Sequence, residues 1–399
     1  MSNKQGRTRR EILADTAKAA AGAAVAGLAG CFPDVGGKWP AAAPDAPPQP
    51  DGGGQCSDGD PTKFGPVTPA VVEVFREDSI VAGTKTTYDP AVVAQMLEAG
   101  LAALANEVKT FEAGGAAGVD GGAVAQDLDN PWPTLLPSYQ QGQRIGLKVN
   151  CLGVVTPSPP LMRALIASLR DKLPIAPGNL RVWDRFLVDI KDHGKWTDED
   201  LGGAANYGTL LRGPSEGETE DDPQLTAGCG YGDTVCSAPL GWDQVKAQPG
   251  MRPRLTRMLT HETDLNINCL ALKSHNISGI TGAIKSVYGI VHNPAEYHKD
   301  FNEVAAQLYA IPAVRKALPL AICDGIVALT MGDPARPANA VAKRILLAQD
   351  PVALDSYIVD LLNELNSGKT RPIDTALLSW LDRAAELGLG TRSYKLVKV

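Results

Sequence analysis

Short apolar runs alternate with segments of helical periodicity along the chain from Val67 onward. Apolar positions recur at helix spacing over residues 91–108 and 161–173. Runs of strand character occupy residues 144–150 and 179–184, on either side of the second of these helices. This strand, helix, strand order is that of a βαβ unit, in which the two strands lie parallel in one sheet.

Two further strands are predicted at residues 265–272 and 318–323. The first leads to a helix that starts near Gly282, and the second ends at Asp324-Gly325. Strands separated by helices predict an α/β fold with a mainly parallel sheet and flanking helices. Ligand sites in such sheets lie at the carboxyl ends of the strands.

Residues 191–250 interrupt this alternation, and we predict that they form an insertion rich in Gly and acidic residues. Long segments with little regular structure are lids, binding loops or surface decoration, and the pattern does not choose among these. The acidic run at residues 216–222 does not have the spacing of an EF-hand, so a solvated charged surface is the favoured interpretation.

The first 30 residues have the charged-then-apolar order of an export signal, with basic residues leading into an alanine-rich stretch at 17–29. That stretch is shorter than the roughly 20 residues that cross a bilayer, and it contains Lys18. Residues 8–13 resemble a twin-arginine motif, and residues 28–31 resemble a lipobox, in which Cys31 is lipidated.

Residues 31–65 are rich in Pro, Gly, Ala and Asp, which predicts a disordered tether between the lipid and the folded domain. The alternative is a disordered basic N-terminus in which Cys31 is an ordinary thiol. The predicted segments are a signal peptide at 1–30, the tether at 31–65 and an α/β domain at 66–399.

The export signal predicts where the protein resides and which machinery handles it. The expected partners are the twin-arginine translocase, the lipoprotein-processing machinery and, through the lipid, a membrane on its periplasmic or extracellular side. Phe32 follows the lipidated cysteine in place of an aspartate, which favours an outer membrane where the organism has one.

Charge disfavours nucleic acid as a partner. The chain carries 38 Lys and Arg against 45 Asp and Glu, a formal net charge of -7. Phosphate backbones are bound by clustered Lys and Arg, and no such cluster is evident in the sequence.

Seven cysteines are too sparse for a disulfide scaffold in a chain of 399 residues. Cys229 and Cys236 close a short Gly-rich loop and form either a disulfide or two free thiols. Cys151, Cys269 and Cys323 lie in apolar runs and are predicted to be small buried side chains. The chain has no CxxC pair, so the spacing does not support an iron-sulfur cluster or a cysteine-only zinc site.

Polar residues gather at the predicted carboxyl ends of the strands. Asn, Asp and Ser are ordinary turn residues, but Lys and His are less expected there, so the pattern favours a functional site over simple turns. The residues concerned are Lys148, Asn150, Asp184, Arg185, Lys273, Ser274, His275, Asn276 and Asp324.

The segment 272–289 holds the richest candidate chemistry. A predicted strand ends at Lys273, and a loop of small residues leads to a helix that begins around Thr281. Backbone amides at that helix start, with Lys285 in its first turn, predict a site for phosphate or carboxylate oxygens. The Walker order of residues is missing, which argues against nucleotide hydrolysis of that type.

Histidines in this region are candidate proton carriers or metal ligands. His275 lies between Lys273 and Lys285, which would favour its neutral form, and functional and structural roles remain equally open for it. His292 and His298 match no helical zinc motif, so a structural role is favoured for both.

Four short motifs, in order, resemble the bacterial and archaeal family known as domain of unknown function 362, over about residues 140–360. They are Leu-Lys-Val-Asn at 147–150, Lys-Ser-His at 273–275 followed by Thr-Gly-Ala-Ile-Lys-Ser at 281–286, Asp-Gly at 324–325, and Asp-Pro-Val-Ala-Leu-Asp at 350–355. The resemblance implies matching polar positions without assigned roles at Lys148, Asn150, Lys273, His275, Lys285, Asp324 and Asp355.

Many relatives in this family carry four-cysteine ferredoxin-like motifs, which this chain lacks, so an iron-sulfur role does not transfer. Ser286 stands where relatives often have Asn.

Three functions remain open: an enzyme acting on a small anionic substrate, a metal- or cofactor-binding redox protein, and a non-enzymatic surface binding lipoprotein. The candidates are His275, Asp324 and Lys273 for catalysis, Lys148, Asn150 and Lys285 for substrate binding, and His275, Asp184 and Asp355 for a metal ion.

Overall fold

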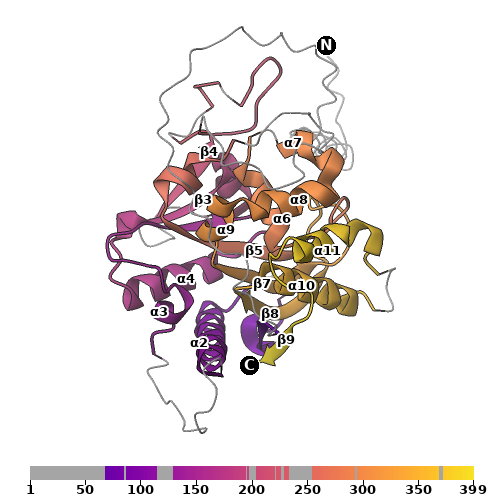
Figure 1. The fold of residues 1–399 in the computed structure, drawn as a ribbon. Helices are drawn as coiled ribbons and strands as arrows, with labels where there is room; N and C mark the ends of the chain where they lie inside the picture. The colour runs from indigo at the N-terminus through magenta and orange to yellow at the C-terminus, as the bar shows by residue number, and fades with distance from the viewer. Residues whose placement is uncertain are drawn as a thin grey trace, which may run out of the picture. The chain divides into compact units, whose positions relative to one another are not determined.

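One mixed β-sheet of nine strands organises the part of the chain that the computed structural model describes (Figure 1). The described residues are 68–84, 87–114, 129–194, 196, 204–220, 222–225, 229–232, 254–292, 294–367 and 372–399. The strands are β1 (Ala70–Phe75), β2 (Ile145–Val149), β3 (Leu180–Phe186), β4 (Ala205–Leu210), β5 (Leu265–His275), β6 (Gly279–Thr281), β7 (Leu320–Leu329), β8 (Ala340–Ala348) and β9 (Lys395–Lys398).

The centre of the sheet is parallel and confirms the predicted α/β class. The strand order is β4-β3-β2-β5-β7-β8-β1-β9, and the five strands from β4 to β7 all run parallel. Strand β8 is antiparallel to both β7 and β1, β9 is parallel to β1, and β6 pairs antiparallel with β5. The carboxyl ends of the five parallel strands therefore share one edge of the sheet.

Helices cover both faces of the sheet, and each face has its own apolar core. The long helices α2 (Pro90–Gly114) and α4 (Pro159–Lys172) pack on one face with the short α3 (Trp132–Leu135). The other face carries α6 (Ala283–Ser286), α8 (Phe301–Ala310), α9 (Pro312–Ala317), α10 (Pro351–Leu365) and α11 (Ser379–Glu386). In Figure 1, α3 and α4 lie to the left of the strands and α8, α10 and α11 to the right.

Strand β5 shows why the central strands have many apolar residues in sequence. Ile267 and Cys269 point into the core beneath α2 and α4, whereas Leu270 and Leu272 point into the core beneath α10. Side chains of a strand alternate between faces, so a strand covered on both faces is apolar at nearly every position.

Helix α2 contains a stretch, Pro90–Thr110, long and apolar enough to cross a membrane. One such helix is weak evidence, because the core helix of a soluble protein meets the same criterion. Val93, Leu97 and Leu101 in this stretch are fully buried or nearly so in the core against the sheet. The packing accounts for its apolar character.

The predicted insertion at residues 191–250 is not confirmed, because β4 lies inside it. This strand pairs parallel with β3, and Arg181 of β3 stacks 5.0 Å from the Tyr207 ring centroid. The sequence of β4, Ala-Asn-Tyr-Gly-Thr-Leu, has few apolar residues, which explains why periodicity did not reveal it. Residues 195, 197–203, 221, 226–228 and 233–250 of this segment lie outside the described residues.

Two strands run further than predicted. Strand β7 continues through Asp324-Gly325 to Leu329, with a register shift between Gly325 and Val327 in its pairing with β8. A bulge accommodates a dipeptide that the sequence analysis interpreted as a strand end. Strand β5 likewise continues to His275 and returns as β6 after a tight turn, where Gly279 has φ of +74°.

We predict that Gly146→Ala lowers the free energy of unfolding by about 2–4 kcal/mol. Gly146 lies on β2 over a buried hydrogen bond from Trp183 Nε1 to Asn266 Oδ1, of 2.9 Å. An added Cβ would lie 1.9 Å from Asn266 Oδ1, so the bond must break or the strands must separate. Urea denaturation measures the change. Gly178→Ala is the matched control, because nothing lies within 4 Å of its added Cβ, and equal effects of the two would contradict the prediction.

Candidate functional site

The buried ion pair between Lys148 and Asp184 lies at the carboxyl ends of β2 and β3. Lys148 Nζ is 2.8 Å from Asp184 Oδ1, and neither side chain is more than 7% exposed. Asp184 also accepts hydrogen bonds from the amides of Cys151 and Arg185, at 2.7 and 2.8 Å. Gly289 covers the pair, because a Cβ there would lie 3.3 Å from Asp184 Oδ1. Lys148 and Asp184 are therefore each other's ion-pair partner.

Lys273 is fully buried on β5 and lies close to that pair. Its Nζ donates to the carbonyl oxygens of Leu152 and Val155, each at 2.8 Å. Burial lowers the pKa of Lys273 to about 8, and the positive charge of Lys285 acts in the same direction. Desolvation disfavours the charged amine, so Lys273 is partly neutral near physiological pH.

His275, at the end of β5, is held as a hydrogen-bond donor. Its Nδ1 accepts a hydrogen bond of 3.1 Å from the amide of Ile277, so the proton of the neutral ring is on Nε2. Burial lowers the pKa of His275, and Lys285, His298 and Lys273 lower it further. The ring therefore stays neutral, as predicted, but this tautomer favours a proton donor over the general base that the sequence analysis considered.

Lys285 and His298 complete what we call the basic cluster, which consists of Lys273, His275, Lys285 and His298. Lys285 Nζ lies 5.5 Å from the Tyr288 ring centroid, and it is 6% exposed. His298 Nδ1 donates to the carbonyl of Pro294 at 2.8 Å. Burial and then Lys285 lower the pKa of His298 to about 4. The charged groups that act on His275 are all positive.

Asp355 of α10 fixes the segment that carries Lys285. Its two carboxylate oxygens accept hydrogen bonds from the amides of Ala283 and Ile284, at 2.5 and 3.0 Å. Gly282 leaves the room for this contact, since an added Cβ would lie 2.1 Å from Asp355 Oδ1. The prediction of an anion site at this helix start is therefore wrong, because the amides of Ala283 and Ile284 already donate to Asp355. Burial raises the pKa of Asp355 to about 7.

Asn268 is a buried residue that the sequence analysis missed. Its side chain donates to the carbonyl of Ala283 at 2.9 Å and accepts a bond from Ser286 Oγ at 2.8 Å. An Asn inside the apolar run of β5 was the available signal, because a buried amide requires partners. Asn268 thus holds α6 at both of its ends, and the Ser286 hydroxyl is used in this contact.

Asp324 does not join the basic cluster. It lies inside β7, where its carboxylate accepts hydrogen bonds from the amides of Ser158 and Ile326, at 2.8 and 3.1 Å. Ser158 is the N-cap residue of α4, so Asp324 ties that helix to the sheet. Burial raises the pKa of Asp324, and its charge is not among those that act on His275. A proton-transfer role beside His275 is not supported by this geometry.

The metal candidates are held in separate places. Asp184 is paired with Lys148, Asp355 caps α6, and His275 bonds to its own turn. Among the described residues, no three His, Cys, Asp or Glu side chains gather where they could hold a metal ion. Asn150, a predicted substrate-binding residue, has a buried Oδ1 without a hydrogen-bond partner in the described part of the chain.

The cysteine predictions have mixed outcomes. Cys151, Cys269 and Cys323 are at most 1% exposed and are buried small side chains as predicted. Cys229 Sγ lies 3.6 Å from Thr256 Oγ1. Cys31 and Cys236 lie outside the described residues, so lipidation and the disulfide stay predictions.

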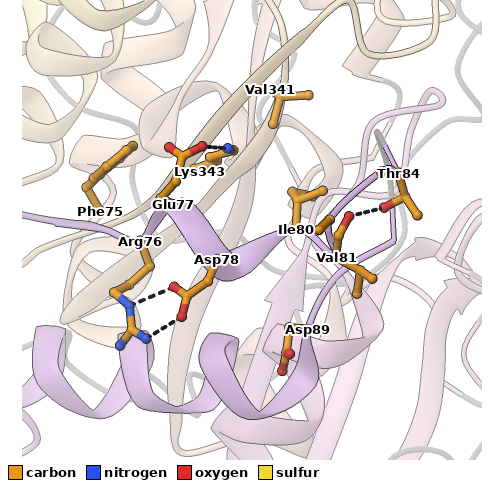
Figure 2. Close-up of a pocket in the computed structure, with 12 residues that line it drawn as sticks. Phe75, Arg76, Glu77, Asp78, Ile80, Val81, Thr84, Asp89, Val341 and Lys343 are labelled. Atoms are coloured by element: carbon orange, nitrogen blue, oxygen red, sulfur yellow. Dashed lines mark hydrogen bonds and ion pairs between the residues drawn. The ribbon is translucent and has the colours of Figure 1, made fainter.

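An open cavity of about 1000 Å³ lies away from the basic cluster, between the end of β1 and the start of β8. Figure 2 shows its lining, in which Arg76 and Asp78 form an ion pair of 2.7 Å. Phe75, Val81 and Val341 expose 40–43% of their surface there. None of the predicted site residues lines this cavity.

The fold and site define an α/β protein with a buried basic cluster at the carboxyl edge of a mixed sheet. The family model described as Domain of unknown function (DUF362) matches residues 219–360, which include all four cluster residues. The match supports membership of this family. Lys148, Asn150 and Asp184 precede the matched part. No curated protein and no solved structure matches the chain.

Lys273→Met gives a test of the buried amine through the pH dependence of stability. The pKa of Lys273 is lowered in the folded state, so the unfolded chain binds more protons between about pH 8 and 10.4. Wild-type stability from this group therefore rises with pH across that window. The Lys273→Met variant lacks this pH-dependent contribution. We therefore expect the difference between the two free energies of unfolding, variant minus wild type, to fall by up to about 3 kcal/mol from pH 7.5 to 10.5.

Parallel denaturation series at several pH values measure this difference. Lys172→Met on α4 is the control, because the Lys172 side chain is 28% exposed and pairs with Glu98. A pH-independent difference for Lys273→Met would show that the amine is not destabilised by burial.

Proposed function

We propose that this chain is an enzyme that acts on a small anionic substrate bound at the basic cluster. The observation that carries the proposal is that Lys285, His298 and Lys273 all lie near enough to the buried His275, at the carboxyl edge of the sheet, to lower its pKa. Lys285 and the protonated fraction of Lys273 create a positive potential in this buried place, which an anion would neutralise. Side chains with strongly shifted pKa values are frequent at functional sites.

The roles follow from the hydrogen bonds of each group. Lys285 supplies positive charge, and His275 offers its Nε2–H to a substrate oxygen. Lys273 is the group whose lowered pKa suits proton exchange near neutral pH. Because Asp355 holds the amides of Ala283 and Ile284, the position of Lys285 is fixed before a substrate binds.

A non-enzymatic binding protein would use the same cluster without turnover. The metal or redox alternative has no specific observation in its favour among the described residues. Anion binding is therefore the first property to test, and turnover is the second.

We expect Lys285→Gln to weaken the binding of inorganic phosphate or oxalate at least tenfold, measured by calorimetry. The control is Lys316→Gln, which removes the same charge from an exposed position on α9. An anion at the cluster also stabilises protonated His298, so its pKa should rise from about 4 when phosphate is added. The NMR signals of His261, before the amino end of β5, should not respond. Equal affinities of the two variants and an unmoved His298 pKa would refute the proposal.

We further propose, from the sequence alone, that the protein is exported by the twin-arginine route and lipidated on Cys31. Replacing Arg9 and Arg10 together by Lys should leave the precursor in the cytoplasm, as cell fractionation would show. Cys31→Ala should abolish incorporation of labelled palmitate and release the protein from membranes. Cys56→Ala is the control, and a palmitate label that survives Cys31→Ala would contradict lipidation at this site.

A further inference from the structure

The hydrogen bonds of Lys273 leave its lone pair unused. Nζ donates to the carbonyl oxygens of Leu152 and Val155, and no carboxylate bonds to it among the described residues. A neutral amine that donates two hydrogens to carbonyls keeps a lone pair that points elsewhere. Lys148, by contrast, is paired with Asp184. Lys273 is therefore the lysine in this region whose nitrogen can act as a nucleophile.

A buried hydroxyl lies on the strand paired with that of Lys273. Thr281 is directly opposite Lys273 in the antiparallel pairing of β5 with β6, so the two side chains point to the same face. Thr281 is 2% exposed, and its Oγ1 has no hydrogen-bond partner in the described part of the chain. A buried hydroxyl that lacks a partner is uncommon and marks a place for a water molecule or a ligand group.

The cover over Lys273 is a surface loop. Residues 152–155, which supply the two carbonyl partners, have neither helix nor strand structure. Val154 in this loop is 52% exposed. The two carbonyl partners of the amine therefore come from a loop that reaches the molecular surface at Val154.

We propose that Lys273 forms an imine with a small aldehyde or ketone that carries a carboxylate or phosphate group, with Thr281 beside the reacting carbon. The inference rests on the proposed function, because Lys285 is to attract the anionic group. The nitrogen lone pair forms a bond to the carbonyl carbon, and the carbonyl electrons move to oxygen, which takes a proton. Loss of that oxygen as water gives the protonated imine, with a net uptake of one proton.

The ionisation of Lys273 supports this chemistry. With a pKa of about 8, roughly one quarter of the amine is neutral at pH 7.5. An exposed lysine of ordinary pKa is neutral in roughly one molecule in a thousand at that pH. Lys273 therefore holds on the order of a hundredfold more of the reactive form.

Reductive trapping on the folded full-length protein tests the inference. The protein is treated with glyoxylate and cyanoborohydride at pH 7.5, and the adducts are mapped by mass spectrometry. We expect Lys273 to be labelled at least tenfold faster than Lys395, whose side chain is 57% exposed. Thr281→Val should slow labelling of Lys273 several-fold and leave labelling of Lys395 unchanged. Labelling of Lys273 only after denaturation would overturn the inference, as would a rate equal to that of Lys395.

A second aldehyde separates this inference from the proposed function. Acetaldehyde has no charge, so wild type should prefer glyoxylate at Lys273, and Lys285→Gln should lose that preference. If Lys273 reacts equally with both aldehydes in wild type, the nucleophile stands and the anion-binding role of Lys285 is refuted. If phosphate binding depends on Lys285 but Lys273 is never labelled, the proposed function stands and the imine is refuted.

Discussion

The two hydrogen bonds from the Asp355 carboxylate to the amides of Ala283 and Ile284 are the constraint on which the site depends. They join α10 to the start of α6, and they require a residue without a side chain at Gly282. Helix α6 has only four residues, which is too short to be stable by itself. Its position, and hence that of Lys285, is therefore set by a carboxylate 70 residues away in the chain.

Buried charge is handled in two ways at this edge of the sheet. Lys148 has a carboxylate partner, and that pair is closed over by Gly289. Lys273 has only carbonyl dipoles, which solvate an ammonium less well than a counter-charge does. The same burial thus leaves Lys148 in an ion pair and makes Lys273 readily neutral. The difference lies in the partner, because both side chains are fully buried.

The sequence revealed the parallel centre of the sheet because β2 and β3 lie on either side of a helical period and β5 holds the apolar run at residues 269–272. It did not reveal β1, β8 and β9, whose pairing joins the two ends of the domain and depends on long-range register. It misplaced Asp324, because an Asp-Gly pair is a turn signal and the bulge that absorbs it is a feature of pairing. The role of Asp355 was equally hidden, since no local pattern indicates a capping partner in a distant helix.

Three members of the basic cluster, Lys273, His275 and Lys285, were candidates from the sequence because they fall within one short segment on β5 and α6. A structural role was expected for the fourth, His298, on the short helix at His298–Asp300. The groups that hold these residues come from elsewhere: Leu152 and Val155 from the loop after β2, and Asp355 from α10. Substitution of a cluster residue changes charge while the distant supports remain. Substitution of Asp355 removes the contact that fixes the segment of Lys285, whereas the carbonyls of Leu152 and Val155 are backbone groups that a side-chain substitution leaves in place. The chemistry at this edge can therefore change through one short segment, whereas the frame that positions it depends on the whole sheet.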